Sequence, residues 1–238
     1  MTSTKVRPQP AQTWWRRPWI APLMLVASAF LAFSVPPYLT FDPAFSRLAP
    51  PPGDELYYPL LVAHVLCGMV AMVTACFQIW PAFRTRYRRG HRITGRVYVF
   101  AGVLPAGLLG LYIGWHTAGG PSVRMANLVG SALWITVTIF GLRMARQRRF
   151  GDHRRWMARS FALTMSIVLS RVITVVATIV LIPQIDTTFD GSAELMTFSA
   201  ASIGVWLSPL LLLLLTDWLL ERRTPARPRS GTASADRR

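Results

Sequence analysis

The sequence predicts an all-α integral membrane protein, a polytopic bundle of six transmembrane helices with both termini in the cytoplasm. Three observations lead to this prediction. The 238 residues are 52% hydrophobic and only 15% charged. The apolar residues form segments close to the roughly 20 residues that a membrane-spanning helix needs. Basic residues alternate between the connections, which orients the chain. The six segments are 19–36, 56–80, 93–116, 125–144, 156–182 and 196–220.

Arginine and lysine are concentrated on every second connection. The N-terminal tail carries four, the second-to-third connection five, the fourth-to-fifth seven and the C-terminal tail six. The opposite connections carry only Arg47 and Arg124, among acidic residues. Since basic residues mark the cytoplasmic side, we expect basic cytoplasmic tails over 1–18 and 222–238, the second one disordered. Between them lies a transmembrane domain over 19–221, with core helices two to five over about 56–182, in the plasma membrane.

The net charge of +16 also bears on partners. Nucleic acid is excluded, because the apolar segments leave no soluble basic domain. The basic cytoplasmic face is expected to contact anionic lipid instead. Cys67 and Cys76 lie on opposite sides of one expected helix and cannot pair. No phosphate loop, Ser-His-Asp set or zinc motif occurs, so the sequence does not decide whether the protein is an enzyme.

The histidines are the most informative polar residues. The chain has four, and all lie in or beside the second, third and fifth segments: His64, His91, His116 and His153. His91 and His153 lie 62 residues apart in RRGHRITGRVY and FGDHRRWMARS, each at the start of an outward-running helix. This spacing suggests a weak repeat of two helical hairpins. A helix N-terminus and neighbouring arginines favour the neutral imidazole, which is the form that binds metal.

The fifth segment carries an arginine at membrane depth. Arg171 lies 18 residues after His153, which is five whole turns, so the two share a helix face with Ser160 and Thr164. An arginine there costs roughly 2.5–3.5 kcal/mol on insertion scales. No acidic residue is expected in the core of the helices to pair with it. Arg171 therefore either faces a bound anion or cofactor in a polar cavity, or is a water-bridged structural residue.

Four phrases carry a resemblance to a known family. LVAHVLCG, FQIWPAFR, GHRITGRVY and DHRRWMARSFAL, followed by LSRV, resemble bacterial predicted membrane proteins that share domain of unknown function 2306. The resemblance covers roughly residues 60–171. It implies a multi-pass membrane protein without an established activity.

A more distant likeness is to the cytochrome b561 family. That family places one histidine on each of four consecutive helices and holds two haems, one between the first and third helices and one between the second and fourth. The resemblance implies that His91 and His153 form one haem pair. His64 matches a third ligand, but the segment 125–144 has no histidine and offers Ala126 and Asn127 near the expected position. His116 would have to replace that partner.

Two functions follow as hypotheses. The first is a b-type haem protein that moves electrons, with His91 and His153 as axial ligands of haem b and His64 and His116 as a second pair. In that protein Arg171 or Arg96 would contact haem propionates or a quinone. The second is a non-redox transporter, lipid-interacting protein or assembly subunit with a polar cavity around Arg171. The two His-Arg motifs could also serve only as basic membrane anchors.

Overall fold

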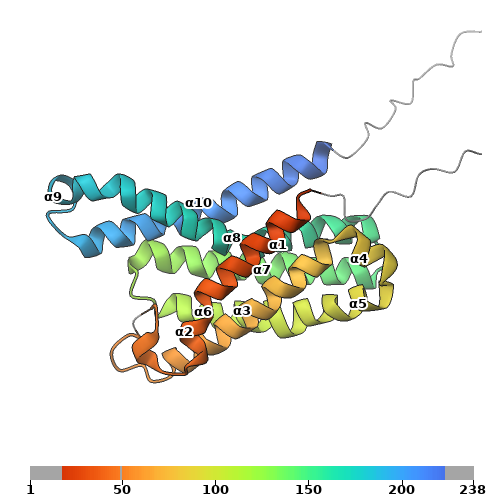
Figure 1. Cartoon of the computed structure of the whole chain (residues 1–238), viewed down its shortest axis with the longest axis horizontal. Coiled ribbons are helices and arrows are strands. Elements are labelled where there is room, and N and C mark those ends of the chain that lie inside the picture. Colours follow the sequence, from red (N-terminus) through yellow and green to blue (C-terminus); the bar gives the residue numbers. More distant parts are fainter. Residues whose placement is uncertain (1–17, 49, 223–238) are drawn as a thin grey trace, which may run out of the picture.

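The computed structural model describes residues 18–48 and 50–222, and helices make up most of this part of the chain (Figure 1). The long helices are α1 (Ile20–Ser34), α3 (Tyr57–Ile79), α7 (Gly120–Arg146), α8 (Phe150–Leu181) and α10 (Ala193–Arg222). Another long helix combines α5 (Arg88–Val97), the π-helical segment η2 (Tyr98–Val103) and α6 (Leu104–Trp115). The short elements are α2 (Pro36–Leu39), η1 (Pro43–Phe45), α4 (Pro81–Arg86), η3 (Ile182–Gln184) and α9 (Ile185–Thr188).

The predicted fold class, an all-α polytopic membrane bundle, is confirmed. Five described helices are long and apolar enough to cross a membrane: Tyr57–Ile79, Arg88–Trp115, Gly120–Arg146, Phe150–Thr188 and Ala193–Arg222. The expected first span corresponds to the shorter α1, which ends where Pro36 begins α2. The count of six spans and the cytoplasmic side of the termini stay predictions. The predicted tails lie outside the described residues, except for Pro18 and Arg222.

The two ends of the bundle differ in charge. Figure 1 shows the start of α1 and the end of α10 at the same end of the bundle as α4 and the α7–α8 connection. We call this the basic end, because α4, α5 and the connection before α8 carry the arginine clusters. The other end, with α2, η1 and α9, carries most of the acidic residues of the connections and is called the acidic end. This arrangement agrees with the alternation of charge along the sequence.

The helices extend beyond the apolar segments at the basic end. The helix expected from residue 93 begins at Arg88, and the one expected from 156 begins at Phe150. Both His-Arg motifs therefore lie within helices. The difference has a simple cause: the apolar pattern marks the part of a helix that faces lipid, whereas backbone hydrogen bonding continues into the polar zone.

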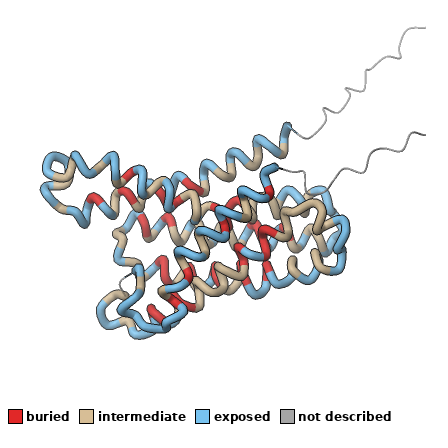
Figure 2. The backbone as a smooth tube through the Cα atoms, in the orientation of Figure 1, coloured by how far each residue is buried: buried red, intermediate tan, exposed pale blue. Residues whose placement is uncertain are grey.

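Close helix crossings hold the middle of the bundle together. A Cβ atom on Gly102 would lie 2.8 Å from Cα of Ala71, so η2 and α3 touch backbone to backbone. Small residues allow this approach in membranes, where packing replaces the hydrophobic effect. The π-helical turn directly precedes Pro105, whose ring disturbs the carbonyl four residues earlier. Figure 2 shows the buried residues on the inward faces of these helices, whereas the hairpin of α8 and α10 diverges toward α9.

Candidate functional site

The basic end brings His91 and His153 near each other. His91 lies in the first turn of α5 and His153 in the first turn of α8. Both side chains are half-buried, and His153 lies close enough to act electrostatically on His91. Arg84 of α4 is a further electrostatic neighbour of His91. The predicted pair therefore meets across two hairpins in an electropositive setting.

The hydrogen bonds of the two imidazoles differ. Nδ1 of His153 donates to the carbonyl oxygen of Gly141 on α7, at 2.8 Å. A carbonyl only accepts, so the proton is on Nδ1 and the neutral ring keeps its lone pair on Nε2. Nδ1 of His91 is buried and has no hydrogen-bond partner among the described residues. The carbonyl of Gly141 thus orients His153 in the way that carbonyls orient metal-binding histidines. Nδ1 of His91 has no such partner.

The residues beneath this pair are apolar and closely packed. Tyr98 and Ala75 belong to a buried cluster against which Leu142, Met157 and Phe161 pack. Met157 also fills the space beside Gly141, where an added Cβ would lie 2.5 Å from its Sδ. The helices below His91 and His153 are therefore packed by apolar side chains.

A buried network of hydroxyl groups lies two helical turns below the histidines. The hydroxyl of Tyr98 hydrogen-bonds with Ser160 at 2.5 Å and with Thr164 at 2.8 Å. Ser160 also bonds Thr138 at 2.6 Å, and Nε1 of Trp134 donates to Thr164 at 3.1 Å. These bonds join η2, α7 and α8. Each polar atom is satisfied by its neighbours, so the network stabilises the relative rotation of the helices that carry His91 and His153.

Part of this network is visible in the sequence. Ser160 and Thr164 are expected on one face of the fifth segment, and both are buried. The bond between Tyr98 and Ser160 is not predicted. The signal was present, because Tyr98 and Ser160 have the same 62-residue offset as His91 and His153.

The other two histidines have separate neighbours. Nδ1 of His64 on α3 donates to the carbonyl of Ala106 at 2.8 Å, and its ring lies beside Gly110. His116 ends α6, where its ring lies 4.2 Å from that of Tyr112 and its Nδ1 donates to the carbonyl of the same residue. A Cβ on Gly110 would also meet Ser131 of α7 at 2.8 Å. Packed atoms thus occupy the surroundings of His64, which leaves the proposed pairing with His116 without support.

The two candidate arginines lie far apart. Arg96 is exposed in the last turn of α5, near the basic end. Arg171 is exposed on α8, 18 residues after His153, or about 27 Å along the helix axis. Its electrostatic neighbours are Tyr38 and Arg47, from the segment around α2. Arg171 shares a face with the buried Ser160, but its own side chain is exposed.

An ion pair joins α8 to α10 near the basic end. Arg159 contacts Asp217 at 2.9 Å, and both side chains remain partly exposed. Arg159 was assigned to the basic anchors, and this contact was missed. Asp217, the one acidic residue within the segment 196–220, was the available signal.

Comparison with known proteins identifies the family. Residues 61–212 match the family described as "Predicted membrane protein (DUF2306)". The chain belongs to this family. The matched region includes all four histidines, Arg171 and the hydroxyl network, whereas α1 and α2 lie outside it. No curated protein and no solved structure matches the chain.

The described residues limit the kinds of metal site that the protein can offer. In residues 18–48 and 50–222, no group of three or more His, Cys, Asp or Glu side chains could hold a metal ion. A pair of histidines is a different case, because a porphyrin supplies four ligands of its own and haem iron needs only one or two from the protein.

Proposed function

We propose that this protein binds haem b between His91 and His153 and transfers electrons at the basic end of the bundle. The observation that supports the proposal is that these two imidazoles, from different hairpins, lie within electrostatic reach of each other. When bound, haem b supplies an iron centre that accepts and releases one electron. The two-ligand requirement of haem also agrees with a site that has two histidines.

The chain's own residues would divide the work as follows. His153 would bind through Nε2, because its Nδ1 donates to Gly141. His91 would be the second ligand. Its buried Nδ1 has no hydrogen-bond partner among the described residues. Met157 and Phe161 would exclude water from below. Arg96 is the candidate for the propionates, while Arg171 is too distant along α8 for that role.

The proposal keeps two expected partners. A quinone is the electron-carrier class that diffuses within a bilayer and can reach a protein of this kind from the side. Anionic lipid is expected around the arginines of α4 and α5, since each basic residue near the surface contributes about 1 kcal/mol of attraction. The alternative of a non-redox transporter, lipid-interacting protein or assembly subunit with a polar cavity around Arg171 stays a prediction.

The test is a reduced-minus-oxidised absorbance spectrum of protein purified from haem-replete cells. We expect Soret and α bands in the wild type and their loss in His91→Ala and in His153→Ala. His116→Ala is the matched control, because it removes the same side chain at the acidic end and should keep the bands. A spectrum without haem bands in the wild type would overturn the proposal, and loss only in His64→Ala would overturn the ligand assignment.

A further inference from the structure

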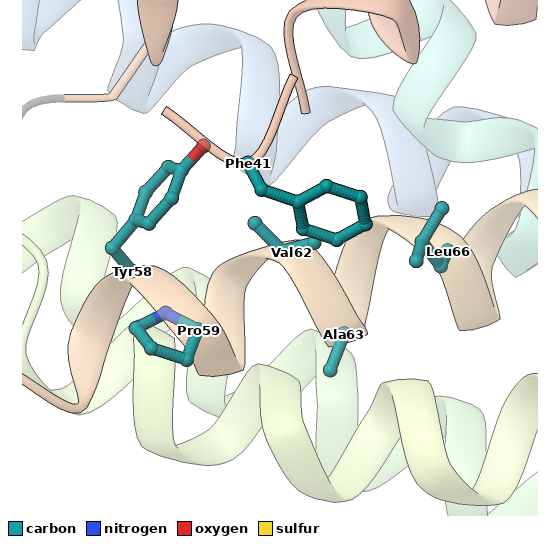
Figure 3. Close-up of a pocket in the computed structure, with 6 residues that line it drawn as sticks. All are labelled: Phe41, Tyr58, Pro59, Val62, Ala63 and Leu66. Carbon is teal, nitrogen blue, oxygen red and sulfur yellow. The ribbon is translucent and has the colours of Figure 1, made fainter. Parts of the chain in front are cut away.

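A cavity of about 430 Å³ lies near the acidic end, between α3 and the segment that follows α2. Five of its lining residues recur at helical spacing along one face of α3, and the sixth comes from the covering segment (Figure 3). The volume falls within the range of about 300–1,000 Å³ that is typical of ligand cavities. The lining residues are Phe41, Tyr58, Pro59, Val62, Ala63 and Leu66.

The cavity wall contains a polar group without a partner. Tyr58 is only 9% exposed, and its hydroxyl has no hydrogen-bond partner among the described residues. Leaving such a group unsatisfied is unfavourable. Figure 3 shows this hydroxyl on the side of the segment that carries Phe41. Because the oxygen is buried, a carbonyl oxygen of a ligand can pair with it only if this segment moves aside.

The covering residue is held in an unfavourable conformation. Phe41 has a φ of 55°, in the left-handed region that a phenylalanine rarely adopts, and its ring is 66% exposed. The turn around it is fixed locally, since Thr40 donates to the carbonyl of Pro37 and Asp42 accepts from the amide of Ala44. Backbone strain of this kind is unfavourable and is concentrated at ligand sites. An unsatisfied hydroxyl and a strained cover therefore occur at one cavity.

The direction of the cavity suits a lipid chain. Tyr58 lies at the start of α3, at the acidic end, and Leu66 lies eight residues further in, about 12 Å along the axis. In a bilayer, ester carbonyls lie at the interface and acyl chains run from there toward the centre. An acyl chain along this face of α3 would place its ester beside Tyr58 and its methylene groups against Val62 and Leu66.

The charges around the mouth select among headgroups. Asp42 acts electrostatically on the phenol of Tyr58, and Asp54 and Glu55 precede α3. Arg47 is the one basic residue in 40–56, and its guanidinium donates to the carbonyl of Phe33 at 2.8 Å while lying over the ring of that residue. Arg171 of α8 acts electrostatically on Tyr38 and Arg47 and brings a second positive charge to this region. The three acidic residues outnumber the two arginines, which favours an ammonium group over a net negative headgroup.

We propose that the cavity binds one acyl chain of an amine-bearing phospholipid, with the Tyr58 hydroxyl donating to the ester carbonyl and the ammonium group near Asp42. The site is independent of the haem proposal, because it lies at the opposite end of the bundle.

The test uses the full-length protein in lipid nanodiscs that contain phosphatidylethanolamine with a diazirine on one acyl chain. After irradiation and digestion, mass spectrometry should find the label on the segment 57–66. Phosphatidylglycerol with the same labelled chain should modify that segment several-fold less. Equal labelling by the two lipids would overturn the headgroup assignment, and labelling that avoids 57–66 would overturn the site.

Variants decide whether the cavity is responsible. Ala63→Phe fills the space from a half-buried position and should remove the label from 57–66. Tyr58→Phe keeps the shape but loses one hydrogen bond, so labelling should fall about three- to ten-fold. Val175→Phe is the control, because it adds a similar ring on the exposed face of α8 and should change nothing. Unchanged labelling in Tyr58→Phe would contradict the hydrogen bond even if Ala63→Phe does not fold.

Discussion

The two helical hairpins of the core place a histidine at the same position, but they use these histidines differently. In the first hairpin, formed by α3 and the helix from α5 to α6, Nε2 of Gln78 donates to the backbone carbonyl of His91 at 2.9 Å. In the second, formed by α7 and α8, the imidazole of His153 itself donates to the carbonyl of Gly141 at 2.8 Å. Both histidines thus lie at the closed end of a hairpin.

This difference separates structure from candidate function. Gln78 links the first hairpin through the backbone and leaves the imidazole of His91 without a hydrogen bond at Nδ1. His153 links the second hairpin through its ring and retains only Nε2 for a ligand. His91 and His153 occupy equivalent positions in the sequence, but only the imidazole of His153 is oriented by a hydrogen bond. Our proposal uses both imidazoles as ligands.

The largest expected effect on stability comes from a glycine at which the two helices of a hairpin pack against each other, and it should differ between the two hairpins. Gly102→Ala should lower the free energy of unfolding by about 1–3 kcal/mol, because the new Cβ meets the backbone of Ala71, which cannot move aside. Gly141→Ala meets the flexible Sδ of Met157, and helix propensity returns up to about 1 kcal/mol. Unfolding in mixed micelles should rank Gly102→Ala as the more damaging change. The reverse order would contradict the close crossing of η2 and α3.

A smaller effect is expected where the two hairpins meet. Tyr98→Phe should cost about 1–2 kcal/mol, because it leaves the buried hydroxyls of Ser160 and Thr164 with fewer partners. Ser160→Ala should cost a similar amount. In a double-mutant cycle the two costs should not add, since each change breaks the same bond. Strict additivity would show that the network does not couple the hairpins.

Gln78→Leu tests the first hairpin alone. The change removes the bonds from Gln78 to the carbonyl of His91 and to Oγ1 of Thr94, and should cost about 1 kcal/mol. Hydrogen exchange of the amides in 88–97 should become faster, while exchange in 150–160 should stay as in the wild type. Faster exchange in both ranges would mean that the hairpins do not behave as separate units at the basic end.

The smallest effect is expected outside the hairpins, between α8 and α10. Asp217→Asn breaks the ion pair with Arg159, but Asp217 is 44% exposed and the pair is screened by water and salt. The loss should stay below about 1 kcal/mol and shrink as salt is added. A larger loss that is independent of salt would show that this pair, rather than the hydroxyl network, dominates the polar stabilisation of α8.

The sequence predicts the helices well because apolar length and charge alternation are local properties. The segment 56–80 was expected as a helix and is observed as Tyr57–Ile79. The depth match of His91 and His153 is also predicted, since both lie in the first turn of helices that start at the basic end. These features require no knowledge of how the helices pack.

Features that depend on packing were not predicted. The periodicity that groups Arg171 with Ser160 is correct as geometry, but the neighbouring helices cover only Ser160, so one residue is exposed and the other buried. The π-helical turn at Tyr98 and the cavity under Phe41 arise from Pro105 and from the turn after α2, which change the path of the backbone. A helical repeat cannot encode such departures from a straight helix.

The most direct test of the central claim is electron paramagnetic resonance of the oxidised, purified protein. The account predicts a low-spin ferric signal typical of two imidazole ligands, retained in His64→Ala and His116→Ala and lost in His91→Ala and in His153→Ala. A protein without haem, or a bis-imidazole signal that survives removal of either His91 or His153, would contradict it.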